Sequence, residues 1–116
     1  ILRAGLRPGL GTDSLASNAS LDPLAEARAL RKRFPTVPTL ELLAMATAWG
    51  ADALGLGELL GRIAPGLAPG LLAFEHGAQA PSDPARFVLD QESAKRSVLV
   101  RPSYQRLAHP SAEVSP

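Results

Sequence analysis

Apolar residues recur at helical spacing soon after the start of the chain, within residues 22–34. Asp22 can accept hydrogen bonds from the free amides of a first helical turn, and Pro23 has a φ already suited to that turn. The apolar face that follows, at i, i+3 and i+7, is Ala27, Leu30 and Phe34. The pattern predicts a helix over 22–34.

A second helical pattern covers residues 39–54, with Thr39 as the expected cap. We expect Gly50 to interrupt this helix and Gly55 to end it. Its apolar stripe is Leu42, Met45, Ala46, Trp49 and Ala53. Met45 and Trp49 could suggest a ligand-binding box, but at this spacing they are more typical of a protein core.

Shorter apolar runs predict three strands, over residues 6–12, 71–75 and 97–101. Before the first, residues 1–5 resemble the last turn of a helix capped by a left-handed glycine. Residues 55–70 are rich in Gly and Pro and predict successive turns. The segment 85–90, ARFVLD, fits either a short helix or a further strand.

Composition and charge narrow the choice of partners. Twelve Lys and Arg residues against eleven Asp and Glu leave a net charge of +1, which provides no field to attract nucleic acid or an anionic membrane. Gly, Pro or charged residues break every apolar run short of the roughly 20 residues of a membrane span. The absence of cysteine fits a reducing cytoplasm. We therefore expect a cytoplasmic protein without nucleic-acid or membrane partners.

One carboxylate stands out among the polar residues. Asp13 lies in the stretch GLGTDSLASN, directly after the first apolar run. It could be a catalytic or metal-binding group, or simply the acid of an Asx turn or a helix cap. Ser17 and Asn18 are expected to shape the loop. The basic cluster Arg31, Lys32 and Arg33 favours a solvated helix end over a phosphate site.

Three sequence blocks in series, AGLRPGLGTDSLASN, LLAMATAWGADALGL and GRIAPGLAPGLLAFE, resemble the C-terminal part of metal-dependent amidohydrolases. The resemblance is to the branch of cytosine, guanine, adenosylhomocysteine and aminofutalosine deaminases and chlorohydrolases. It implies an α/β fold, the C-terminal fragment of a (β/α)₈ TIM-type barrel joined to strands of a small β-sandwich. Residues 1–56 would be the last barrel strand and its following helices, 57–103 part of the sandwich, and 104–116 a flexible tail.

The same resemblance implies a hydrolase that acts on C–N bonds through a metal-activated water. Asp13 would be both a ligand of a divalent metal, Zn or alternatively Fe, and the group that shuttles a proton. The other ligands, mainly histidines, would lie outside this segment, because His76 and His109 match no ligand position and are expected at the surface. The implied partners are a small purine-like substrate and the remainder of the barrel, with a homodimer left open.

A different class of function stays open beside the enzyme. The chain could be a fragment or an interaction module with no activity of its own. The two hypotheses differ in one observation, whether the reading frame upstream of Ile1 encodes a strand with a His-x-His pair.

Overall fold

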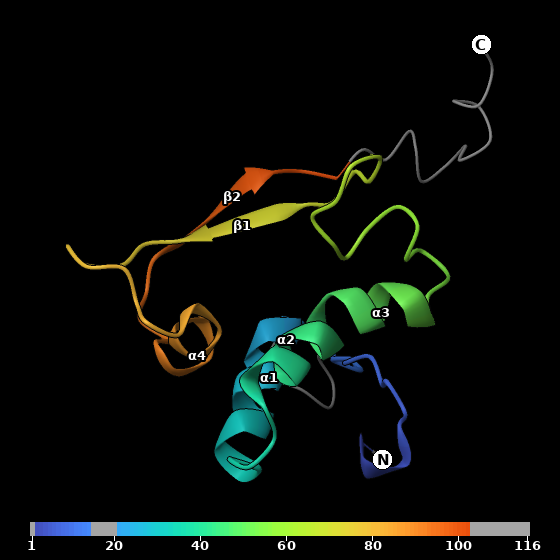
Figure 1. Cartoon of the computed structure of the whole chain (residues 1–116), viewed down its shortest axis with the longest axis horizontal. Helices are drawn as coiled ribbons and strands as arrows, with labels where there is room; N and C mark the ends of the chain where they lie inside the picture. Colours follow the sequence, from blue (N-terminus) through green and yellow to red (C-terminus); the bar gives the residue numbers. More distant parts are fainter. Residues whose placement is uncertain (1, 15–20, 103–116) are drawn as a thin grey trace.

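Helices and one two-stranded sheet make up the α/β fold of this chain (Figure 1). The structure is a computed structural model that describes residues 2–14 and 21–102. None of the helices in those residues is long and apolar enough to cross a membrane. The elements are the 3₁₀ turn η1 (Leu2–Ala4), α1 (Pro23–Arg33), α2 (Thr39–Ala46), α3 (Ala48–Ala53), β1 (Leu71–Phe74), α4 (Pro84–Asp90) and β2 (Arg96–Val100).

Helix α1 confirms the first predicted helix and its cap. The Asp22 side chain accepts a hydrogen bond from the amide of Leu24 at 3.0 Å, and Ala27 is fully buried. The predicted apolar face is wrong at one residue, because Phe34 is 47% exposed. Phe34 is the C-cap, with φ −128° and ψ 69°, so its side chain leaves the helical phase that buries Ala27.

The second predicted helix is divided, and the division falls at Thr47 rather than at the expected Gly50. Thr47 has φ −132° and ψ −92°, and its hydroxyl donates to the carbonyl of Leu43 at 2.7 Å. A threonine that bonds the preceding turn in this way competes with the helical backbone. Gly50 lies inside α3, so the prediction that it interrupts the helix is wrong.

The break also changes which side chains face the core. Leu42 and Met45 are buried as predicted, but Ala53 is exposed, and Ala51 is the buried residue of α3. The phase of α3 is set by Thr47 and not by the stripe that begins in α2. The expected cap is wrong as well: Pro38 is the N-cap, with no side-chain hydrogen bond, and Thr39 is the first helical residue.

Gly55 ends α3 as predicted. Its φ is 74°, and its amide donates to the carbonyl of Asp52 at 3.0 Å while that of Leu56 donates to Ala51 at 2.8 Å. This pair of bonds is the Schellman arrangement, which needs a left-handed residue and so favours glycine. The chain from there to residue 70 forms turns and bends without a helix or strand, as expected.

Three helices share one small core. Residues 85–90 belong to helix α4, which settles the choice between a helix and a strand. The Asp83 side chain caps this helix by accepting a hydrogen bond from the amide of Arg86 at 3.0 Å. Leu89 of α4 is buried against α1 and α2. Leu2, Leu10 and Trp49 pack around this core, partly buried. Its buried members are Leu24, Ala27, Leu42, Met45 and Leu89.

The two C-terminal predicted strands are confirmed to within one residue at each end. β1 and β2 pair antiparallel, with Phe74 opposite Arg96 and Leu72 opposite Val98, and the register shifts between Leu71 and Leu72. Every residue of β2 is exposed. In Figure 1 this ribbon and the N-terminal segment, residues 2–14, lie on opposite sides of the molecule.

The predicted strand over residues 6–12 is not formed. The segment is neither helix nor strand, and the strands of the described residues, β1 and β2, pair only with each other. A parallel strand needs a neighbour to share its hydrogen bonds, and Pro8 has no amide to contribute. Before it, Gly5 confirms the expected left-handed cap: its φ is 76°, and its amide donates to the carbonyl of Leu2 at 3.0 Å.

Candidate functional site

Asp13 stands exposed near the end of the N-terminal segment, on the approach to α1. Its φ is 57°, and within residues 2–14 and 21–102 it is the one residue other than glycine with a positive φ. Aspartate enters this left-handed region more readily than most residues, because its short side chain can bond to the nearby backbone. The backbone at Asp13 therefore lies in the left-handed region, where few residues other than glycine are found.

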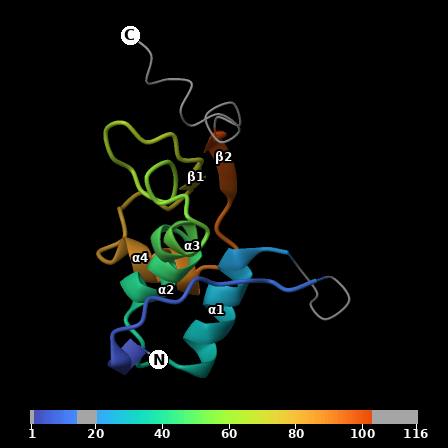
Figure 2. The same cartoon turned by 90° about the vertical axis from the view of Figure 1, so that its right-hand side faces the viewer.

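The segment that leads to Asp13 is fixed against the helices. The amide of Leu10 donates to the carbonyl of Met45, the penultimate residue of α2, at 3.0 Å. The Arg7 guanidinium lies 6.0 Å from the centre of the Trp49 ring, within the range of a cation–π contact. Figure 2 shows the segment passing next to α2. Asp13 thus extends from an anchored stretch of backbone.

The described residues do not form a metal site by themselves. No group of three or more His, Cys, Asp or Glu side chains comes together in residues 2–14 and 21–102. A protein metal centre of the zinc type needs at least three protein ligands. Asp13 offers an oxygen donor of the right chemistry, but as a single ligand it fits only a site completed by other residues.

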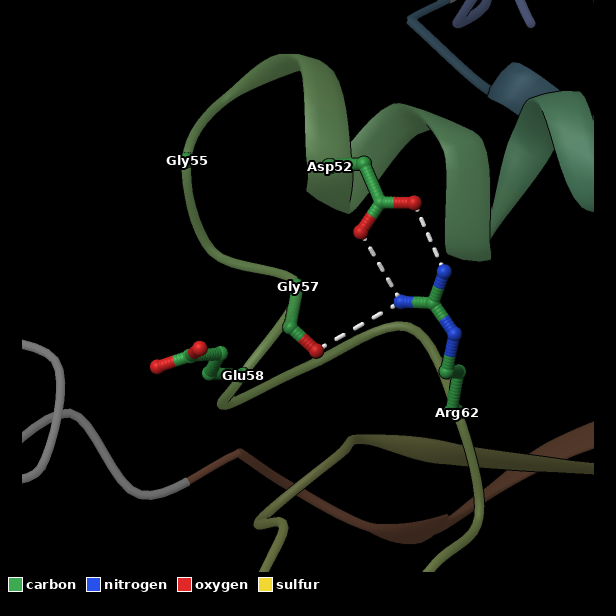
Figure 3. A pocket seen from close by; sticks show the side chains of 5 residues that line it. All are labelled: Asp52, Gly55, Gly57, Glu58 and Arg62. Carbon is green, nitrogen blue, oxygen red and sulfur yellow. Dashed lines mark hydrogen bonds and ion pairs between the residues drawn. The ribbon is translucent and has the colours of Figure 1, made fainter.

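A second polar feature, which the sequence did not reveal, joins the last turn of α3 to the loop that follows it (Figure 3). Arg62 donates to both carboxylate oxygens of Asp52, at 3.0 and 2.6 Å, and this hydrogen bonding holds the pKa of Asp52 below its ordinary value. Gly55, Gly57 and Glu58 line the same shallow hollow. Arg62 is also engaged with the carbonyl of Gly57, at 3.4 Å. The pair closes the turn rather than presenting a free charge.

The basic cluster at the end of α1 is engaged with α4 and the residues that follow it. Arg31 pairs with Asp90 at 3.2 Å and Lys32 with Glu92 at 2.6 Å. The Arg31 side chain is only 17% exposed, so the expectation of a fully solvated helix end is wrong for this residue. Since both cations are paired with carboxylates, the arrangement favours the structural reading over a phosphate site.

The described histidine is a surface residue, as predicted. His76 is exposed, and its Nδ1 lies 2.7 Å from the carbonyl oxygen of Gly77. His109, Ser17, Asn18 and the expected tail 104–116 lie outside the described residues.

Comparison with known proteins identifies the family. The amidohydrolase family pattern matches residues 1–101, so the chain belongs to the amidohydrolase family. Proteins named 5-methylthioadenosine/S-adenosylhomocysteine deaminase are similar: that of Pelotomaculum thermopropionicum is 44% identical over 79 residues, 62% of this chain and 18% of the relative. That of Syntrophomonas wolfei is 42% identical over 73 residues, 57% of this chain and 17% of the relative.

The chain therefore spans less than a fifth of the length of these curated relatives. No solved structure matches it significantly. The resemblance stated from the three sequence blocks is confirmed at the level of the family and of its deaminase branch.

Proposed function

We propose that this chain is part of a deaminase that hydrolyses the C–N bond between a purine-like ring and its amino group, releasing ammonia. The observation that supports this is the family match over residues 1–101 together with relatives named as deaminases of adenosine derivatives. A non-enzymatic interaction module is the alternative, and the experiment below separates the two.

In this proposal Asp13 is the catalytic residue of the segment. A divalent metal, zinc or alternatively iron, would supply an acidified water at the site. One Asp13 carboxylate oxygen would bind the metal, and the carboxylate would accept the proton of the attacking water and return it to the departing amine. Its exposure leaves the carboxylate accessible to a substrate, and its left-handed φ of 57° sets the direction in which the side chain leaves the backbone.

The proposed whole fold is a (β/α)₈ barrel with a small β-sandwich, in which residues 1–56 lie at the end of the barrel and 57–103 in the sandwich. The pairing of β1 with β2, apart from the N-terminal segment, supports a separate sheet. The proposed boundary at residue 56 divides the chain in sequence only: in space the two parts are in contact, because Leu89 of α4 packs into the core of α1 and α2. A cytoplasmic location is proposed on composition alone.

The test is Asp13→Asn in the full-length enzyme, with adenosine derivatives as substrates. The amide keeps the shape and one coordinating oxygen but cannot accept the proton, so kcat should fall by about 10⁴ or more at equal metal content. Asp83→Asn is the matched control: Asp83 is an exposed helix cap, asparagine caps equally well, and its kcat should not change.

A loss below about tenfold for Asp13→Asn would remove Asp13 from the proton-transfer step. The absence of deamination in the full-length protein at full metal occupancy, over a panel of purine-like substrates, would favour the interaction module.

A further inference from the structure

The N-terminal segment meets the helix break at an unusually close backbone approach. A Cβ built on Gly9 would lie 2.9 Å from the Cα of Gly50 and 3.6 Å from the Cβ of Ala53. Real Cβ atoms essentially never come within 3.0 Å of another heavy atom. Gly9 has no left-handed φ, so glycine serves here to let two stretches of backbone touch, not to permit a turn.

The same place holds the hydrogen bond from Leu10 to Met45. In a continuous helix the carbonyl of Met45 would point to the amide of Trp49, one turn further on. The departure of Thr47 from helical dihedrals ends α2 directly after Ala46, and a carbonyl at a helix end can accept from another segment. The break in the helix and the attachment of residue 10 are therefore one structural feature.

Gly50 lies close to the acceptor of this hydrogen bond on the helix side. A Cβ on Gly50 would lie 3.2 Å from the carbonyl oxygen of Met45, the atom that accepts from Leu10. That spacing is tighter than nine in ten real Cβ contacts, so the carbonyl would have to move by a few tenths of an ångström. An added methyl group at Gly9 would meet Gly50, and one at Gly50 would meet the Met45 carbonyl, so both would disturb the place where Leu10 is attached.

We propose that Gly9, Gly50 and the Met45 carbonyl form an anchor that positions Asp13. Only three peptide units separate Leu10 from Asp13, so at most roughly 10 Å of chain connects the fixed amide to the carboxylate residue. A displacement at the anchor has little length over which to relax before it reaches Asp13. Gly9 and Gly50 are positioning residues in this scheme, and the inference rests on the proposed function of Asp13.

The experiment is a mutant cycle in the full-length enzyme, with kcat normalised to folded, metal-loaded protein. Gly9→Ala should lower kcat by about 10- to 100-fold, the scale expected when a catalytic group moves by up to about 1 Å. In the Asp13→Asn background the same change should add less than about twofold, because its effect passes through the Asp13 carboxylate. A purely structural loss would be equal in both backgrounds.

Two further variants complete the design. Gly50→Ala lies inside α3, where alanine favours the helix by about 1 kcal/mol, so this variant should fold even where Gly9→Ala does not, and its kcat should fall in the same Asp13-dependent way. Gly77→Ala is the control, since a Cβ at Gly77 meets nothing within 4 Å and its φ is not left-handed; its kcat should match the parent enzyme.

The outcomes separate this inference from the proposed function. The anchor would be overturned if Gly9→Ala lowered kcat equally with and without the Asp13 carboxylate, or if neither Gly9→Ala nor Gly50→Ala lowered kcat. Either result would leave the proposed role of Asp13 unaffected. Activity that survives Asp13→Asn would remove Asp13 from the proton-transfer step, and the absence of deamination in the full-length parent protein would overturn the proposed function itself.

Discussion

Arg31 of α1 and Asp90, the last residue of α4, form an ion pair at 3.2 Å that joins two helices far apart in the chain. Next to it, the Arg28 guanidinium donates to the carbonyl of Val88 at 2.8 Å. The charged face of α1 therefore fixes α4 over the core that Leu89 enters.

This pair predicts a sensitivity to acid. The hydrogen bond from Arg31 first, and that from Arg86 as well, hold the pKa of Asp90 below its ordinary value of 3.8. A carboxyl with a lower pKa in the folded state stabilises the fold above its unfolded-state pKa, and that stabilisation is lost as the pH falls through the folded-state value. Asp90→Asn should therefore flatten the fall in melting temperature below about pH 4. An unchanged pH profile would contradict the prediction.

Leu42 predicts the largest effect on stability among the leucines of α2. It is 1% exposed and packs in the shared core, so Leu42→Ala should cost about 2–5 kcal/mol of unfolding free energy. Leu40→Ala makes the same change two residues earlier in α2, at a side chain that is 72% exposed. It should change the free energy of unfolding by no more than about 0.5 kcal/mol. Denaturant unfolding of both variants gives the comparison, and equal losses would show that the core is placed wrongly.

Asp22 is predicted to stabilise the fold in two separable ways. It caps α1 through Leu24 and pairs with Arg96 of β2 at 2.8 Å. Asp22→Ala removes both interactions and should cost about 1 kcal/mol from the cap alone, whereas Asp22→Asn keeps an oxygen acceptor and loses only the charge. Thermal melts should therefore rank the parent protein first, asparagine second and alanine last. Asparagine as destabilising as alanine would mean that the cap contributes nothing.

The 116-residue chain on its own should neither turn over substrate nor bind metal well. Its described residues bring no three ligands together, and one carboxylate cannot replace them. Calorimetric titration with Zn²⁺ should give binding no tighter than that of a surface carboxylate, unchanged by Asp13→Asn. Chelator-sensitive deamination by this chain would contradict the prediction.

Local signals predicted the elements that depend on neighbours in sequence. The Asp22–Pro23 start of α1, the glycine that ends α3 and the two C-terminal strands all follow from residues within a turn or a strand of each other. Asp13 could be singled out because a carboxylate among glycines and hydroxyl residues is conspicuous in any sequence.

The features that the sequence missed depend on contacts between distant residues. Gly50 has a lower helix propensity than Thr47, so the sequence predicts the break at Gly50, yet the break falls at Thr47. The break coincides with two contacts, the hydrogen bond from the Thr47 hydroxyl to the Leu43 carbonyl and the hydrogen bond from the distant Leu10 amide to the Met45 carbonyl, and the local pattern does not reveal the second. The pairing of Asp52 with Arg62 is equally hidden, since it depends on how the intervening turns fold back.

The exposed ribbon of β1 and β2 has a consequence for how the nascent chain avoids aggregation. Val98, Leu99 and Val100 form a run of three β-prone side chains, each 45–68% exposed, of the kind that can recruit strands from other molecules while a protein is still folding. Arg96 lies two residues before this run and Arg101 directly after it. Charged residues in those flanking positions act as gatekeepers, because stacking identical copies would place like charges side by side.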